Sequence, residues 1–399
     1  MTKSPNLREP LKILTLNAIA GVGLQRFPAE RYRVGTDVAA PDAILVRSHD
    51  MHAMDIPASV KAIGRAGAGT NNIPVDKMNQ RGAPVFNAPG ANANAVKELV
   101  IAALLMAARN LLPAVRFVDG LSGDDKTLHL LVEDGKKQFA GFELPGRTLG
   151  IIGLGRIGSL VADAAIKLGM DVLGYDPEIT VDAAWSLPAQ VRRAHSIEEV
   201  LKAADFVTLH VPLVPATRNL INVKRVALLK KGAVVLNFSR EGIVDNDAVL
   251  EALAAKRLRV YVCDFPARKL SGHPQVVALP HLGASTREAE DNCAVMVADQ
   301  VRDFLEHGNI RNAVNFADVV MSRESAYRVA ITNANVPNMV GQISTAIANA
   351  GLNIHNMLNK SRGELAHTLV DVDSPVPDAL IAELVAIKGV LAVRYLPTA

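Results

Sequence analysis

The sequence predicts an α/β protein with two doubly wound domains, each built on a parallel sheet, and a smaller C-terminal domain of ferredoxin-like βαββαβ order. Three observations favour this fold class. Short runs rich in Val, Ile and Leu alternate with helical stretches over most of the chain, which is the pattern of parallel sheets. The 399 residues exceed what one hydrophobic core usually organises. From residue 325 onward the elements follow a different order.

The first domain is expected to be discontinuous, comprising residues 1–96 and 285–316. A helix over 285–307 and the segment GNIRNAVNF would return the chain to it. Between the two parts, residues 95–115 are apolar nearly all round and predict one long helix buried between two domains. The strands expected in the first domain end in Gly, Asn, Ser or Pro and span 11–19, 43–48, 60–67 and 83–90.

The second domain is expected to cover residues 97–284. Helical stretches separate most of its apolar runs, as in a doubly wound sheet. Its expected strands are 148–153, 170–176, 205–211, 233–238, 259–265 and 276–280.

The third domain is expected over 325–399, after a linker at 317–325. Its pattern reads strand 326–333, helix 337–350, strand 352–359, strand 364–372, helix 377–387 and strand 390–396. This βαββαβ order is ferredoxin-like.

The overall composition excludes several classes of partner. The 43 basic and 40 acidic residues nearly balance, so no nucleic-acid partner is expected. Cys263 and Cys293 alone cannot form a disulfide framework, which favours a reducing compartment such as the cytoplasm. The N-terminus has no apolar signal segment, and the longest apolar run, 99–108, is about half of a membrane span. We expect no membrane association and no metal.

Three glycines carry the strongest local signal. Gly153, Gly155 and Gly158 form G-x-G-x-x-G between an apolar strand and a helical run. Glycine there allows a tight turn, close approach of a pyrophosphate and packing of helix on strand. Asp176 closes the next strand, where its carboxylate would bind the adenosine ribose and repel a 2′-phosphate. The pattern predicts a Rossmann-like NAD site, with a cofactor-free glycine turn as the alternative.

Two side chains suit hydride transfer to or from an oxo acid. Arg240 follows the strand 233–238 and supplies a planar, bidentate cation. His281 follows the strand 276–280 and can move a proton near neutral pH. The carboxyl ends of such strands face the ligand crevice. Taken singly, a surface arginine and a structural histidine remain the alternatives.

These segments, taken together, resemble the signatures of the D-2-hydroxyacid dehydrogenases. The matching motifs are GRTLGIIGLGRIG, LHVPL (209–213), NFSREGIVD (237–245), LPHLGAST (279–286) and, in the first domain, GRAGAGTNNIPV (64–75) and NAPGANANAVKELV (87–100). The resemblance implies that Arg240 binds and polarises the substrate and that His281 transfers the proton. It also implies that the NAD site is lined by Gly153, Gly155, Arg156, Ile157, Gly158, Asp176, Val211, Phe238 and Asp264.

The sequence departs from that family at two positions. A glutamate that pairs with the histidine in most members is absent, because the segment 263–274 is one residue shorter and places Arg268 near its position. Either Glu288 or Glu290 replaces it, or His281 acts without a carboxylate. The glycine that usually follows the arginine directly is displaced to Gly242.

Two features favour 3-phosphoglycerate as the substrate. Arg47 and Ser48 resemble the segment that contacts the substrate phosphate in family members acting on phosphoglycerate, and a guanidinium beside a hydroxyl suits a phosphate. The backbone of Gly67, Ala68 and Gly69 would hold the substrate carboxylate, with Asn92 nearby. The alternatives are a reductase of glyoxylate, hydroxypyruvate or a D-lactate-type acid, and a non-catalytic NAD-sensing regulator.

The second feature is the third domain, because residues 326–396 resemble an ACT domain, a module that senses amino acids. The resemblance implies that Asn333, Asn335 and Asn353 contact L-serine as an allosteric effector. Asn338 stands where glycine is usual, and asparagine tolerates a positive φ. An assembly domain without a ligand is the alternative, and the resemblance implies a homodimer or homotetramer.

Overall fold

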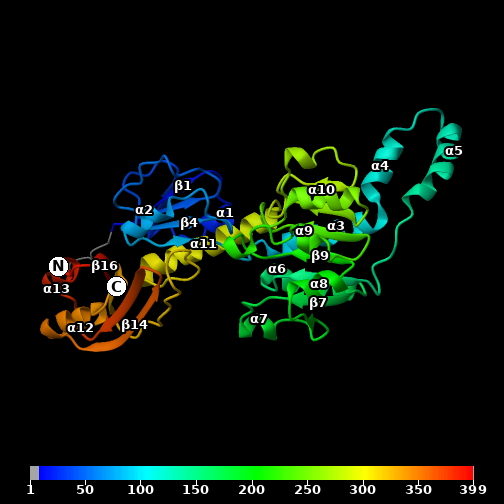
Figure 1. The fold of residues 1–399 in the computed structure, drawn as a ribbon. Coiled ribbons are helices and arrows are strands. Elements are labelled where there is room, and N and C mark those ends of the chain that lie inside the picture. The colour runs from blue at the N-terminus through cyan, green and yellow to red at the C-terminus, as the bar shows by residue number, and fades with distance from the viewer. Residues whose placement is uncertain (1–8, 399) are drawn as a thin grey trace. The chain divides into compact units, whose positions relative to one another are not determined.

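The computed structural model describes residues 9–398, and these form two compact units (Figure 1). The first unit contains the chain up to Asn92 and again from Arg287 onward. The second contains Ala93–Thr286. Both changeovers lie a few residues from the boundaries expected at 96/97 and 284/285, and each coincides with the start of a long helix.

The first unit begins with a five-stranded parallel sheet of order β2-β1-β3-β4-β5. Helices α1 (Gly21–Leu24) and α11 (Arg287–His307) pack on one face and α2 (Val75–Gln80) on the other. The strands are β1 (Leu11–Leu16), β2 (Tyr32–Gly35), β3 (Ala43–Val46), β4 (Ala62–Arg65) and β5 (Val85–Phe86). The sequence analysis missed β2, because a four-residue edge strand carries little apolar signal.

The second unit is a seven-stranded parallel sheet of order β12-β11-β10-β9-β6-β7-β8. The chain reverses direction across the sheet between β6 and β9, which is the switch point where such sheets bind ligands. The strands are β6 (Thr148–Ile152), β7 (Asp171–Tyr175), β8 (Arg192–Arg193), β9 (Phe206–Leu209), β10 (Ala233–Asn237), β11 (Leu258–Cys263) and β12 (Val276–Ala278).

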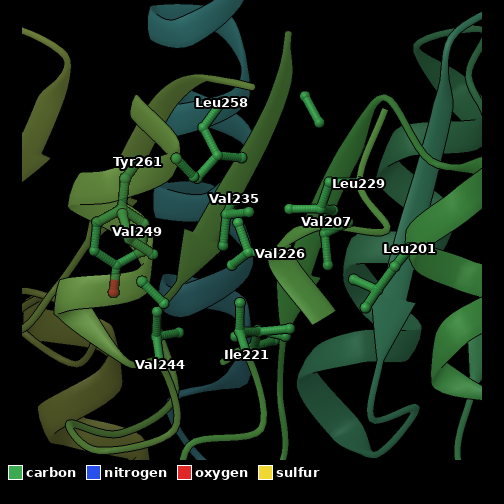
Figure 2. Packing of buried hydrophobic residues seen from close by; sticks show 14 of the residues in the cluster. Leu201, Val207, Ile221, Val226, Leu229, Val235, Val244, Val249, Leu258 and Tyr261 are labelled. Carbon is green, nitrogen blue, oxygen red and sulfur yellow. The ribbon is translucent and has the colours of Figure 1, made fainter. Parts of the chain in front are cut away.

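Helices cover both faces of this sheet, as the doubly wound prediction requires. Helices α3 (Ala93–Arg109) and α6 (Arg156–Lys167) pack on one face. Helices α8 (Ile197–Ala203), α9 (Val223–Val226) and α10 (Asn246–Ala254) pack on the other. Figure 2 shows the second of these cores, in which Leu201, Val207 and Val235 are fully buried. A short helix, α7 (Val181–Trp185), follows β7.

The prediction of one buried helix over 95–115 is wrong beyond Arg109. Asn110 adopts a left-handed φ of 52°, and α4 (Leu111–Asp119) leaves at 67° to α3. The Asn110 side chain stabilises this break by donating to the carbonyls of Phe139 and Ala140. No residue of α4 or α5 (Asp125–Gly135) is buried, and the pair projects from the sheet of this unit (Figure 1).

Within residues 9–398, no single helix is long and apolar enough to cross a membrane. Helices α3 and α4 pass that test only when they are joined across their bend.

The C-terminal module, residues 327–397, has the predicted βαββαβ order and a four-stranded antiparallel sheet of order β14-β15-β13-β16. Helices α12 and α13 pack on one face. The elements are β13 (Tyr327–Ala334), α12 (Met339–Asn349), β14 (Ile354–Arg362), β15 (Leu365–Val372), α13 (Asp378–Ala386) and β16 (Val390–Pro397). Asn338 has a φ of 66°, so asparagine does make the left-handed turn before α12.

The other face of the module's sheet packs against the end of α11. Arg394 donates to the carbonyls of Phe304 and Leu305. Arg328 and His367 bond the carbonyls of His307 and Gly308, at 3.2 and 2.8 Å. A helix C-terminus carries unsatisfied carbonyls and a partial negative charge, so these basic side chains fix the module to α11.

Candidate active site

The three glycines of the second unit each meet a separate steric requirement. Gly153 has a φ of 95°, and a Cβ there would lie 2.6 Å from the His210 carbonyl oxygen. A Cβ on Gly158 would lie 2.0 Å from the Gly153 oxygen, so α6 packs closely on the loop. A Cβ on Gly155 would meet nothing within 4 Å, which leaves the loop open to an approaching ligand. These residues fit a dinucleotide.

The N-terminus of α6 is available to an anion. Gly155 is its N-cap and no side chain caps the first turn, so the first backbone amides of the helix can bind phosphate. Arg156 is exposed and Ile157 is half-buried at this end.

Asp176 lies directly after β7 and beside the glycine loop. Its carboxylate accepts hydrogen bonds from the backbone amides of Leu154, at 2.8 Å, and Glu178, at 3.0 Å. Because each carboxylate oxygen can accept more than one bond, the fixed carboxylate can still accept from a ribose hydroxyl.

Two predicted cofactor residues lie in positions that limit what their side chains can contact. Phe238 is buried in the apolar cluster shared with α3 and α6, so its ring does not line an open site. Val211 is half-buried, and its carbonyl accepts a hydrogen bond from the Ser239 hydroxyl. This bond joins the carboxyl ends of β9 and β10.

Asp264 organises the loop that carries His281. Its buried carboxylate accepts from the amides of Leu282 and Gly283, both at 2.7 Å, and its carbonyl accepts from the His281 amide. Both carboxylate oxygens are therefore occupied within the protein. In this structure the Asp264 carboxylate positions the loop that carries His281, and its role at the cofactor stays a prediction.

His281 has a left-handed φ of 58° and an exposed side chain. Its ring lies 5.0 Å from the Phe265 ring, centroid to centroid. Within Ala93–Thr286, no carboxylate bonds to His281, and Arg268, near the position of the family's glutamate, is exposed. The histidine is held by backbone geometry and an aromatic neighbour.

Arg240 is exposed after β10, and its backbone is fixed from both sides. Asn237 donates from its side chain to the Arg240 carbonyl at 3.0 Å, and the Arg240 guanidinium donates to the Ser239 carbonyl at 2.7 Å. The displaced Gly242 has a φ of 81° and makes the turn. Strands β10 and β12 flank β11, so Arg240 and His281 follow strands about 10 Å apart at one edge of the sheet.

Arg47 and Ser48 follow β3 in the first unit. Arg47 forms an ion pair with Glu290 in the first turn of α11, with Nη2 and Oε1 2.6 Å apart, and both side chains are partly exposed. Ser48 is exposed. Glu290 is therefore the ion-pair partner of Arg47 within this unit.

The loop after β4 is partly available to an anion. The Gly67 amide donates to the Arg65 carbonyl at 2.8 Å, so this amide is already engaged within the protein. Within residues 9–398, the amides of Ala68 and Gly69 have no hydrogen-bond partner. Asn87, which the sequence analysis did not select, fixes the loop by donating to the Ala68 carbonyl at 2.6 Å. Asn92 is half-buried just before α3.

The three asparagines expected to bind an effector do not come together in one copy. Asn333 is buried at the far end of β13, and Asn335 bonds the Gly363 carbonyl at the same end. Asn353 is exposed beside Asp373, at the end of the sheet where Tyr327 begins β13. Six residues of strand separate the two ends, which is roughly 20 Å. Within a single copy these three asparagines therefore do not line one shared site.

The comparisons with known proteins agree with this geometry. Residues 101–283 match the family model described as the D-isomer specific 2-hydroxyacid dehydrogenase, NAD binding domain. A D-3-phosphoglycerate dehydrogenase of Haemophilus influenzae is 33% identical over 84% of this chain and 81% of its own length. One from Methanocaldococcus jannaschii is 34% identical, but the chain spans 62% of its length.

Solved structures of related dehydrogenases have a similar fold. A 3-phosphoglycerate dehydrogenase of Entamoeba histolytica with bound NAD+ is 25% identical, with a TM-score of 0.60, over 77% of this chain and 99% of that one. A D-2-hydroxyisocaproate dehydrogenase shares the fold, with a TM-score of 0.62 at 24% identity over 76% of this chain and 99% of that one. The chain therefore belongs to the D-isomer-specific 2-hydroxyacid dehydrogenases, which bind NAD through the domain matched here.

Proposed function

We propose that the chain oxidises D-3-phosphoglycerate to 3-phosphohydroxypyruvate with NAD, the first step of L-serine biosynthesis. The observation that carries the proposal is Arg47, a partly exposed guanidinium at the carboxyl end of β3. It stands at the same sheet edge as the open amides of Ala68 and Gly69. A dianionic phosphate and a carboxylate suit these two groups. Relatives named D-3-phosphoglycerate dehydrogenase support the same substrate.

In this proposal each group has one chemical task. Arg240 binds the substrate and polarises the oxygen on C2, and the His281 imidazole takes the hydroxyl proton. Bound NAD would supply the acceptor for the hydride lost from C2. The glycine loop and the amides of α6 would hold its pyrophosphate, and Asp176 would hold its ribose.

The test is turnover with a panel of oxo acids and NADH. We expect 3-phosphohydroxypyruvate to be reduced far faster than glyoxylate, hydroxypyruvate or pyruvate. A preference for an unphosphorylated acid would favour a related reductase. NADH binding without turnover of any acid would favour the NAD-sensing regulator.

Asp176→Ser should narrow the preference for NAD over NADP by roughly tenfold, because the carboxylate that repels a 2′-phosphate is removed. The measurement is kcat/KM for each cofactor at saturating phosphoglycerate. Glu178→Ser, an exposed neighbour, is the matched control and should leave the ratio unchanged. An unchanged ratio in Asp176→Ser would contradict the assignment of the ribose contact.

We also propose that residues 325–399 form an ACT regulatory domain that binds L-serine. The βαββαβ order and the left-handed Asn338 support this assignment. Because Asn335 and Asn353 lie at opposite ends of one sheet, a site that uses both requires two copies of the chain.

Calorimetry of the full chain with L-serine tests this assignment. Binding should be saturable, and Asn335→Ala and Asn353→Ala should each weaken it. If the wild-type chain showed no heat of binding, the domain would serve assembly and would not bind L-serine.

The proposed assembly is a homodimer through the arm α4–α5, with module pairing as a route to a homotetramer. The arm exposes the apolar side chains of Leu111, Val115, Val118, Leu130 and Leu131. Val115→Asp should therefore shift the sedimentation coefficient toward a monomer.

We propose that the chain lies in the cytoplasm, where the buried thiols of Cys263 and Cys293 stay reduced. Burial raises the pKa of both thiols.

A further inference from the structure

A cavity of about 420 Å³ lies inside the first unit, between the C-terminal module and the amino ends of β4 and β5. Lys61, just before β4, and Arg81, at the end of α2, line it on one side. Thr332, His367 and Arg394 line it from the module. Arg47 follows the carboxyl end of the neighbouring strand β3, and the loop of Ala68 follows the carboxyl end of β4. The cavity is therefore at the opposite edge of the sheet from the candidate substrate site.

The cavity is lined by basic side chains. Among residues 9–398, three cations line it and no aspartate or glutamate does. Lys61 is paired with Asp42, outside the lining, whereas Arg81 and Arg394 bond only backbone carbonyls among the described residues. Burial lowers the pKa of Arg394 to about 10, as expected for a guanidinium removed from water. An anion placed in the cavity would replace part of the stabilisation that the Arg394 guanidinium loses when it is removed from water.

Two polar atoms of the lining residues are without partners. Thr332 and His367 are 4% and 1% exposed, and Thr332 Oγ1 and His367 Nδ1 have no hydrogen bond within residues 9–398. His367 Nε2 lies 2.8 Å from the Gly308 carbonyl and must donate to it, which leaves Nδ1 as an acceptor. Buried groups of this kind are normally satisfied. The cavity thus offers cations, a hydroxyl and a nitrogen that accepts a hydrogen bond.

We propose that this cavity binds a small oxyanion, a carboxylate or a phosphate that also carries a hydroxyl group. The anion would pair with Arg81 and Arg394, and the hydroxyl would donate to His367. Such a ligand contacts the sheet and the module at once, so its binding would stabilise the docking of the module on the first domain. This site is separate from the proposed substrate and serine sites, and its test does not depend on either.

Calorimetry of the full chain with glycerol 3-phosphate and with L-malate tests the proposal and separates a phosphate from a carboxylate ligand. We expect saturable binding of at least one probe. Arg81→Gln should weaken it about tenfold or more, because a hydrogen bond to a charged group is lost. Thr332→Val, which preserves shape, should weaken it severalfold. Arg33→Gln, an exposed arginine on β2 that does not line the cavity, should leave it unchanged.

One further variant, together with those above, makes each outcome decisive. Arg47→Ala should keep the binding, because Arg47 belongs to the other sheet edge. Loss of binding in Arg47→Ala with retention in Arg81→Gln would move the ligand to the substrate site and overturn the proposal. Binding of neither probe would also overturn it, as would equal weakening by Arg33→Gln and Arg81→Gln. Matching melting temperatures of the free variants would exclude misfolding as the cause.

Discussion

His281→Asn should lower kcat by about 10²–10⁴-fold in both directions, which is the usual contribution of a general acid or base. Binding of NADH should change little, because the imidazole acts on the substrate oxygen. Asparagine is the appropriate replacement, since His281 has a φ of 58° and asparagine adopts left-handed backbone more readily than most residues. The measurements are steady-state rates and NADH fluorescence titration.

His195→Asn provides the matched control, because His195 is an exposed histidine of the same unit, before α8. It should retain wild-type rates. If His281→Asn kept more than about a tenth of the wild-type kcat, the loss in kcat would be smaller than the loss of a general acid or base causes. The proton-transfer group would then be misassigned. A large loss of NADH affinity in His281→Asn would instead indicate a disturbed loop over Asp264.

Arg328→Met should destabilise the first unit by about 3–5 kcal/mol, because it leaves a buried carboxylate without its partner. Arg328 and Asp371 are both fully buried and form two bonds, of 2.6 and 2.8 Å. The guanidinium also donates to the carbonyls of His307, Met321 and Ser322. It therefore joins the module, the linker and α11. Urea denaturation would measure the loss.

The double variant Arg328→Met with Asp371→Leu should recover part of that stability, since it removes both charges from the interior. Lys167→Met breaks an exposed ion pair within α6 and should cost less than about 1 kcal/mol. If Arg328→Met cost no more than Lys167→Met, the buried pair would not hold the module in place.

The parallel sheets were predictable because their central strands are buried on both faces and appear as continuous apolar runs. The edge strands β2 and β8 were not. Strand β8 consists of the two exposed residues Arg192–Arg193, which have no apolar signal. The end of α3 was missed because the apolar pattern continues past Asn110, and a single left-handed residue breaks the helix there.

The residues of the candidate site likewise fall into those that the sequence could predict and those that it could not. The glycines, Arg240 and His281 follow strands and could be selected from local pattern. Glu290, Asn87 and the contacts of the module with α11 could not, because they depend on pairs far apart in sequence. Arg47 and Glu290 are 243 residues apart, and no local signal links them. Sequence also could not show that the Asp264 carboxylate accepts from the amides of the loop that carries His281.

We propose that this chain recognises a phosphorylated hydroxy acid through Arg47. The most direct measurement is kcat/KM with NADH for 3-phosphohydroxypyruvate and for hydroxypyruvate, in the wild-type chain and in Arg47→Ala. We expect Arg47→Ala to lower kcat/KM about 30-fold for the phosphorylated acid, because roughly 2 kcal/mol of charged hydrogen bonding is lost. For hydroxypyruvate we expect kcat/KM to fall less than about twofold. Equal losses for the two acids would contradict it.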